Sequence, residues 1–340
     1  MRGPPRVLSI DLLRLLAAVQ MVHGHTIAAL LEQSARHGTI YRTWLALRGL
    51  TAVAFLLASG MAFQLATLRD LDAHRRDRER VRKRFARALH LVLLGYLLRF
   101  PLPFDATSSL GALLRDGLAV DVLQCIGVCL ALCEGLTLLL PSAPAVELGC
   151  AIVGVAMLGL SPLAARIEAR GPWLPLLDYA TSTGGSAFPL LPWGAHMLLG
   201  VAMARSLVGD GARPFRVLLT ALAALAASHL CAGAAPPLLA DHLRRLGGVL
   251  LALWTLALLE PAARRLPSWT WQLSSSTLIL YVAHVWPLYG RRFGLASLVG
   301  PTLSAPAAIA VALGVLAFSV GSVFAYDRLV AGLAHRTATG

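Results

Sequence analysis

Long apolar runs recur from one end of the chain to the other, and they constrain its fold more than any other feature. A membrane-spanning helix needs about 20 consecutive, mostly apolar residues. We predict about ten such spans, at residues 7–31, 45–67, 87–104, 119–140, 145–163, 188–208, 215–234, 244–261, 271–290 and 305–328. They take up most of the 340 residues, of which only 14% are charged. The sequence therefore predicts one all-α, polytopic membrane bundle over residues 1–340, with no room for a sizeable soluble domain.

Basic segments between the predicted spans set the expected orientation. The segment Arg69–Arg87 carries nine basic and four acidic residues. Loops rich in Lys and Arg stay in the cytoplasm, which also places the N-terminus in the cytoplasm. Cytoplasmic loops of this kind explain the net charge of +13 without a nucleic-acid partner. Residues 105–115 fit either an external loop or a short interfacial helix.

The five cysteines predict neither a disulfide framework nor a metal site. Cys125, Cys129 and Cys133 follow one another at intervals of four residues, which places them on one face of a predicted span. Ligand spacing with interleaved histidine or acidic residues is missing from the sequence. We interpret these cysteines as small apolar packing residues.

The first predicted span contains four ionisable groups, Asp11, Arg14, His23 and His25. An α-helix turns 100° per residue, so Arg14 and His25, eleven residues apart, lie within about 20° of one face. Their separation along the axis is about 16 Å at 1.5 Å per residue. Asp11 precedes Arg14 by three residues, a spacing at which opposite charges meet. His23 points away from this face and is interpreted as structural.

Charged groups at membrane depth cost at least about 2.5–3.5 kcal/mol each, and they usually face a bundle interior or a water-filled cavity. The alternative for Asp11 and Arg14 is a structural ion pair at the cytoplasmic edge. For His25 the alternative is a helix-end histidine capped by a loop. The shared face of Arg14 and His25 favours a common functional role.

The first helix resembles the R-x10-H signature of transmembrane acyltransferases. The closest resemblance is to the heparan-α-glucosaminide N-acetyltransferase-like branch, with the acyltransferase-3 family as a broader relative. Four later stretches agree in order along the chain: RGLTAVAFLLASGMAF (Arg48–Phe63), DVLQCIGVCLAL (Asp121–Leu132), FPLLPWGAHMLLGVAMAR (Phe188–Arg205) and LSSSTLILYVAH (Leu273–His284). One departure is Leu15, which stands where the family often has glycine and narrows the groove beside Arg14.

The resemblance implies transfer of an acyl group, most simply acetyl, from cytoplasmic acyl-CoA to a hydroxyl or amine of a glycan, a lipid-linked acceptor or another envelope component. His25 is then a general base or a covalent acyl carrier. Asp11 and Arg14 shape the channel floor, and Arg14 also contacts CoA. Acyl-CoA is a co-substrate, and no permanently bound cofactor or metal is expected. Arg82 and Arg84 are candidates for binding CoA, although orientation alone also explains their basic segment.

Further polar residues are candidates for contacting the acceptor. Gln124 either orients a carbonyl group or makes a helix–helix hydrogen bond. Trp193 is either an acceptor contact or an interface anchor. Tyr281 and His284 lie one turn apart in the ninth predicted span, where His284 is either a second site histidine or part of an interhelical hydrogen bond. His196 and His229 are interpreted as structural.

Two other classes of protein fit the same polar residues. In a transporter or channel, Asp11, Arg14 and His25 would form a proton or anion path. In a non-catalytic scaffold that keeps the fold, these three residues would have no catalytic role. The ordered resemblance and the absence of visible internal repeats favour the acyltransferase, embedded in a bacterial inner membrane. The acceptor, the acyl chain length and the oligomeric state stay open.

Overall fold

The computed structural model describes residues 7–99, 117–168, 173–208, 213–234, 237–290 and 293–339. Within these ranges the chain forms helices and no β-strand, apart from an isolated bridge between Leu31 and Leu303. The prediction of an all-α fold is confirmed. The predicted loop or interfacial helix at 105–115 falls outside the described residues.

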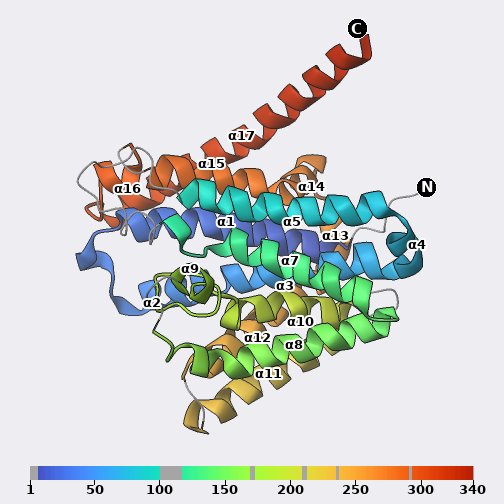
Figure 1. Cartoon of the computed structure of the whole chain (residues 1–340). Coiled ribbons are helices and arrows are strands. Elements are labelled where there is room, and N and C mark those ends of the chain that lie inside the picture. Colours follow the sequence, from blue (N-terminus) through green and yellow to red (C-terminus); the bar gives the residue numbers. More distant parts are fainter. Residues whose placement is uncertain are drawn as a thin grey trace. The chain divides into compact units, whose positions relative to one another are not determined.

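The first of two compact units comprises Met1–Leu13 and Ala52–Pro261. Within it α5 packs along α7, α8 packs on α10, and α11 pairs with α12 (Figure 1). Its helices are α3 (Thr51–Thr67), α4 (Leu71–Arg76), α5 (Arg78–Arg99), α7 (Val122–Leu139), α8 (Ala143–Ala164), α9 (Leu174–Leu177), α10 (Leu190–Val208), α11 (Pro214–Ala234) and α12 (Pro237–Leu258).

The second unit comprises Arg14–Thr51 and Ala262–Gly340. It contains most of α1 (Leu8–Leu30), followed by α2 (Gly38–Gly49), α14 (Ser268–Ser275), α15 (Thr277–Tyr289), α16 (Leu295–Leu298) and α17 (Ala305–Thr339), with the short α13 (Glu260–Ala263) at the junction. Buried Ile27 of α1 packs with Ala308 and Ala312 of α17, which forms a small apolar core.

The membrane prediction is confirmed by the length and composition of the helices. Six helical segments of the described chain are long and apolar enough to cross a bilayer: Leu8–Leu30, Gly38–Arg76, Val122–Leu139, Ala143–Ala164, Pro214–Ala232 and Ala305–Gly332. The other four predicted spans are helical as well, in α5, α10, α12 and α14–α15. The total of about ten spans stays a prediction.

The basic segment Arg69–Arg87 is helical over most of its length, which corrects its prediction as a loop between spans. Its acidic residues explain the difference. The Asp70 side chain accepts a hydrogen bond from the Ala73 amide at 3.1 Å and caps α4, and Asp77 accepts one from the Arg80 amide at 3.1 Å at the start of α5. Carboxylates at helix starts satisfy amides that have no partner within the helix.

Glycines allow two helices of the first unit to approach closely. A Cβ atom added to Gly60 of α3 would lie 1.9 Å from the Met197 carbonyl oxygen of α10. One added to Gly200 of α10 would lie 2.3 Å from the Leu57 carbonyl oxygen of α3. Small residues of this kind let membrane helices pack backbone to backbone. Gly60, within the sequence motif Arg48–Phe63, therefore serves packing.

Candidate active site

One face of α1 presents both Arg14 and His25 to α15. The Arg14 Nη2 donates to the Thr277 hydroxyl at 3.3 Å, and the His25 Nδ1 lies 3.0 Å from the His284 Nε2. The two side chains thus share a helix face, as 100° per residue predicts. They contact α15 at points two turns apart, so they form one polar seam in the second unit.

The centre of this seam is a pair of imidazole rings. The rings of His25 and His284 have centroids 5.1 Å apart, and His284 is fully buried. The Tyr281 ring packs edge-on against His284 at 5.5 Å, and the Tyr289 ring packs edge-on against His25 at 5.8 Å. The Tyr289 hydroxyl donates to the His25 carbonyl oxygen at 3.3 Å. Each imidazole therefore packs edge-on against one tyrosine ring.

The hydrogen-bond network fixes which nitrogen of His25 carries a proton. The His284 Nδ1 lies 3.0 Å from the Leu280 carbonyl oxygen, which only accepts, so Nδ1–H of His284 is the donor. The Nε2 of neutral His284 is then an acceptor, and it accepts from Nδ1–H of His25. Neutral His25 consequently carries its lone pair on Nε2. This assignment follows from the network, as imidazole tautomers generally must.

Three predicted site residues belong to the first unit, whereas the imidazole pair belongs to the second. Asp11 lies in the part of α1 that belongs to the first unit, so its contact with Arg14 stays a prediction. Gln124 of α7 is fully buried, and its Oε1 accepts the Asp121 amide at 3.2 Å in a capping box. Trp193 of α10 packs edge-on against His242 at 4.8 Å, with the Arg245 guanidinium 5.7 Å from its ring centre. Their acceptor roles stay predictions.

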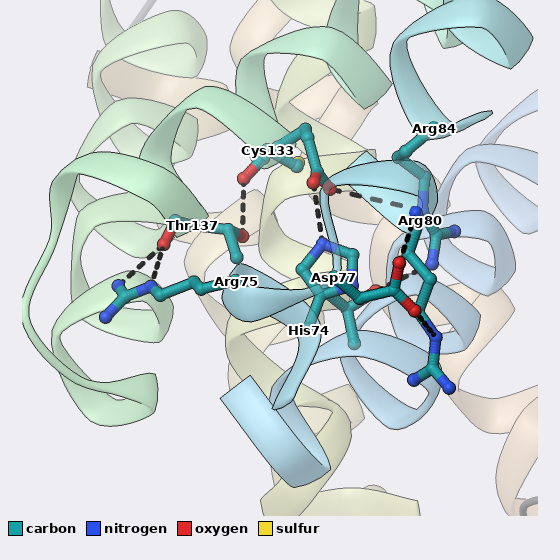
Figure 2. Close-up of polar contacts among 9 residues, drawn as sticks. His74, Arg75, Asp77, Arg80, Arg84, Cys133 and Thr137 are labelled. Atoms are coloured by element: carbon teal, nitrogen blue, oxygen red, sulfur yellow. Dashed lines mark hydrogen bonds and ion pairs between the residues drawn. The ribbon is translucent and has the colours of Figure 1, made fainter. Parts of the chain in front are cut away.

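The candidate CoA-binding arginines Arg82 and Arg84 lie on α5 and differ in environment. Arg82 is exposed and makes an ion pair with Glu79 at 2.8 Å. Arg84 turns inward, where its Nη2 donates to the Thr67 hydroxyl at 2.9 Å and its Nε lies 4.0 Å from the buried Glu134 carboxylate (Figure 2). Arg84 therefore has a structural partner, and CoA binding by either arginine stays a prediction.

A buried polar cluster beside these arginines was not predicted. The His74 Nε2 lies 2.6 Å from the Glu134 Oε1, and both side chains are buried. Arg75 donates to the Thr137 carbonyl oxygen at 2.8 Å (Figure 2). It also contacts the Leu140 carbonyl oxygen, just beyond the end of α7. The cluster fastens α4 to α7. Glu134 within an apolar span was the signal in the sequence that could have revealed it.

Sequence reasoning also missed residues next to the imidazole pair. The aliphatic part of Arg48, in the last turn of α2, packs on Gly24, because an added Cβ at Gly24 would lie 3.1 Å from the Arg48 Cγ. The positive charge of Arg48 disfavours a positive charge on His25. Its guanidinium also lies 5.8 Å from the centre of the Trp44 ring. Tyr289 is the second such residue, five residues beyond the end of the stretch LSSSTLILYVAH.

His196 and His242 form a second imidazole pair, in the first unit. The His196 Nε2 lies 3.0 Å from the His242 Nδ1, and their rings stack with centroids 5.3 Å apart. His196 was predicted as structural, and His242 was not predicted. Among the described residues, no group of three or more His, Cys, Asp or Glu side chains is placed to hold a metal ion.

Taken together, the helices and the seam of polar side chains at membrane depth define a polytopic helical membrane protein. The family model for heparan-alpha-glucosaminide N-acetyltransferase, catalytic domain, matches residues 6–236. The chain belongs to this family and is therefore a membrane acetyltransferase. A comparison with curated proteins gave no match. His25 and Arg14 lie within the matched residues, whereas His284 and Tyr289 lie beyond them, so their link to His25 rests on geometry.

Proposed function

We propose that this protein moves an acetyl group from acetyl-CoA, supplied from the cytoplasm, to a hydroxyl or amine of a glycan or other envelope acceptor. Family membership supports the acetyl transfer, and the hydrogen-bonded His25–His284 pair supports His25 as the reacting group. The proposed location is a bacterial inner membrane with the N-terminus in the cytoplasm, which rests on the basic segments.

The pair is suited to general base catalysis at the Nε2 of His25. As the acceptor oxygen or nitrogen attacks the thioester carbonyl carbon, Nε2 takes the acceptor's proton. The tetrahedral intermediate then expels the CoA thiolate, which receives that proton from His25 and leaves as the free thiol. During attack His25 is an imidazolium, and its Nδ1–H bond to His284 becomes charge-assisted and stronger. His284 is thus a positioning residue that also stabilises the charged intermediate.

Covalent transfer uses the same nitrogen. Nε2 attacks the thioester carbonyl carbon, the carbon–sulfur bond breaks, and CoA leaves as its thiolate, which finally takes up the proton that the acceptor releases to the histidine. The acetyl group on Nε2 then passes to the acceptor, whose proton returns to the histidine. Both routes need a lone pair on Nε2, which is the consequence of the network through His284 and Leu280.

Arginines of this chain have the chemistry to hold the donor. CoA carries phosphates, and guanidinium groups pair with phosphates in a bidentate manner. Arg14 lies about 16 Å along α1 from His25, in the half that we place toward the cytoplasm. We propose that Arg14 contacts CoA, with Arg82 and Arg84 as further candidates, while Gln124, Trp193 and Tyr281 are candidates for the acceptor.

The test uses the full chain in lipid nanodiscs with acetyl-CoA and glucosamine as the probe acceptor. We expect free thiol to appear together with acetylated glucosamine, and both to depend on His25. Proton or solute flux into liposomes without acetyl-CoA is measured in parallel. Flux that depends on His25, with no acetyl-CoA binding detectable by calorimetry, would establish the transporter alternative and overturn the proposal.

A further inference from the structure

An open groove runs along the contact between α5 and α7 in the first unit. Its volume is about 640 Å³, within the range of about 300–1,000 Å³ that small-molecule sites span. The two helix backbones meet beneath it, because a Cβ atom added to Gly127 would lie 2.7 Å from the Ala88 carbonyl oxygen. Its lining includes Phe85, Leu89 and Val92 of α5 and Ala131 of α7, and Arg82 is the one charged or polar lining residue in the described chain.

The groove has the polarity and length of one lipid chain. Arg82 lies at one end, and apolar side chains continue to Val92, ten residues further along α5. Ten helical residues span about 15 Å, which is half of the approximately 30 Å hydrocarbon core of a bilayer. Leu89 in the middle of the groove is 58% exposed. The lining therefore matches a single membrane leaflet, from the headgroup level to the midplane.

The charge at the polar end selects the headgroup. From Arg78 to Arg87 the helix carries six basic residues and one acidic residue, Glu79. The Arg82 side chain is 77% exposed at the groove's end, whereas Arg84 is turned inward to Glu134 (Figure 2). Clusters of Lys and Arg next to a membrane helix attract anionic lipids, with about 1 kcal/mol for each basic residue. A sugar would find almost no hydrogen-bonding partner along this lining.

We propose that the α5–α7 groove binds one acyl chain of an anionic phospholipid, with the lipid phosphate against Arg82. The groove belongs to the first unit and the imidazole pair to the second. The proposal assigns Arg82 to a lipid phosphate rather than to CoA, and it does not depend on the acetyl transfer proposed at His25. Glu79 weakens the predicted lipid binding. Its carboxylate makes ion pairs with Arg82 at 2.8 Å and Lys83 at 3.5 Å, which lowers the attraction of both residues for a phosphate.

The test is native mass spectrometry of the full chain, titrated with phosphatidylglycerol or with phosphatidylcholine of the same chains. We expect tighter binding of phosphatidylglycerol. Arg82→Gln should weaken phosphatidylglycerol binding about fivefold, which corresponds to one basic residue, and leave phosphatidylcholine unchanged. Glu79→Gln should strengthen phosphatidylglycerol binding. Ala131→Phe, which fills the groove, should weaken both lipids.

Matched variants separate the groove from general membrane effects. Arg216→Gln removes an exposed arginine at the start of α11 and should leave binding of both lipids unchanged. If Ala131→Phe fails to fold, Ala86→Phe at the groove's rim makes the same test. Equal affinity for the two lipids, or equal effects of Arg82→Gln and Arg216→Gln, would overturn the proposal. Displacement of the lipid by inorganic phosphate would overturn it too, by assigning the site to a soluble anion.

Discussion

Replacing His284 by phenylalanine is the perturbation that tests the role of the imidazole pair most selectively. Phenylalanine keeps a ring at this buried position but removes the nitrogen that accepts from Nδ1–H of His25. His25 itself, with the Nε2 that we assign to the reaction, stays in place. The variant therefore separates positioning from the chemistry of the reacting group.

The expected loss follows from the change in hydrogen-bond strength during the reaction. A hydrogen bond between neutral groups contributes about 0.5–1.5 kcal/mol, and one to a charged group about 1.5–3 kcal/mol. The bond from His25 to His284 thus gains about 1–2 kcal/mol when His25 becomes an imidazolium. With 1.36 kcal/mol for each factor of ten, His284→Phe should lower kcat by about 5- to 30-fold and change KM little.

Steady-state kinetics of thiol release, with nanodisc-embedded protein, measure both constants. His284→Gln is the matched variant, because an amide offers an oxygen to His25 and an N–H to the Leu280 carbonyl, so it should keep most of the activity. In the background of His25→Ala, His284→Phe should have no further effect, since the two residues act as one unit. A His284→Phe variant with unchanged kcat, or one as inactive as His25→Ala, would refute the positioning role.

Three further variants test the packing and the charges. Gly60→Ala should lower the melting temperature, because the added methyl group would lie 1.9 Å from a carbonyl oxygen of α10. Gly135→Ala of α7, where an added methyl group would have nothing within 4 Å, should not lower it. Equal melting temperatures of the two variants would argue against the close α3–α10 contact. Arg48→Gln should raise kcat, because the positive charge of Arg48 opposes the positive charge that His25 acquires during attack, and unchanged or slower thiol release would contradict this. His74→Ala should lower the free energy of unfolding of the first unit by about 3–5 kcal/mol, because Glu134 loses its closest buried partner. Chemical unfolding measures this, and a change below about 1 kcal/mol would contradict the prediction.

The first helix shows how far the sequence alone could lead. The turn of 100° per residue places Arg14 and His25 on one face, and the structure has both on the face that meets α15. The partner of His25 could not be derived in this way, because His284 is 259 residues away along the chain. Helix periodicity describes one helix at a time and says nothing about which helix packs against which.

Other residues were open to sequence reasoning but were interpreted differently. Asp121 and Gln124 are three residues apart before an apolar run, which is the spacing of a capping box, and the structure shows that bond. Glu134 lies within an apolar span, where an ionisable residue needs a partner, but nothing in the sequence identifies His74 as that partner. The segment Arg69–Arg87 was predicted as a loop from its charge, yet its acidic residues cap and stabilise helices.

The central claim is that the Nε2 of His25 carries out the acetyl transfer, and single-turnover kinetics test it most directly. The chain and its His25→Ala variant are each mixed with radiolabelled acetyl-CoA and an excess of glucosamine, and the affinity for acetyl-CoA is measured separately by calorimetry. We expect the variant to bind acetyl-CoA with unchanged affinity and to transfer the acetyl group at least about 100-fold more slowly, as the loss of a general base requires. A variant that transfers at the wild-type rate would contradict the claim.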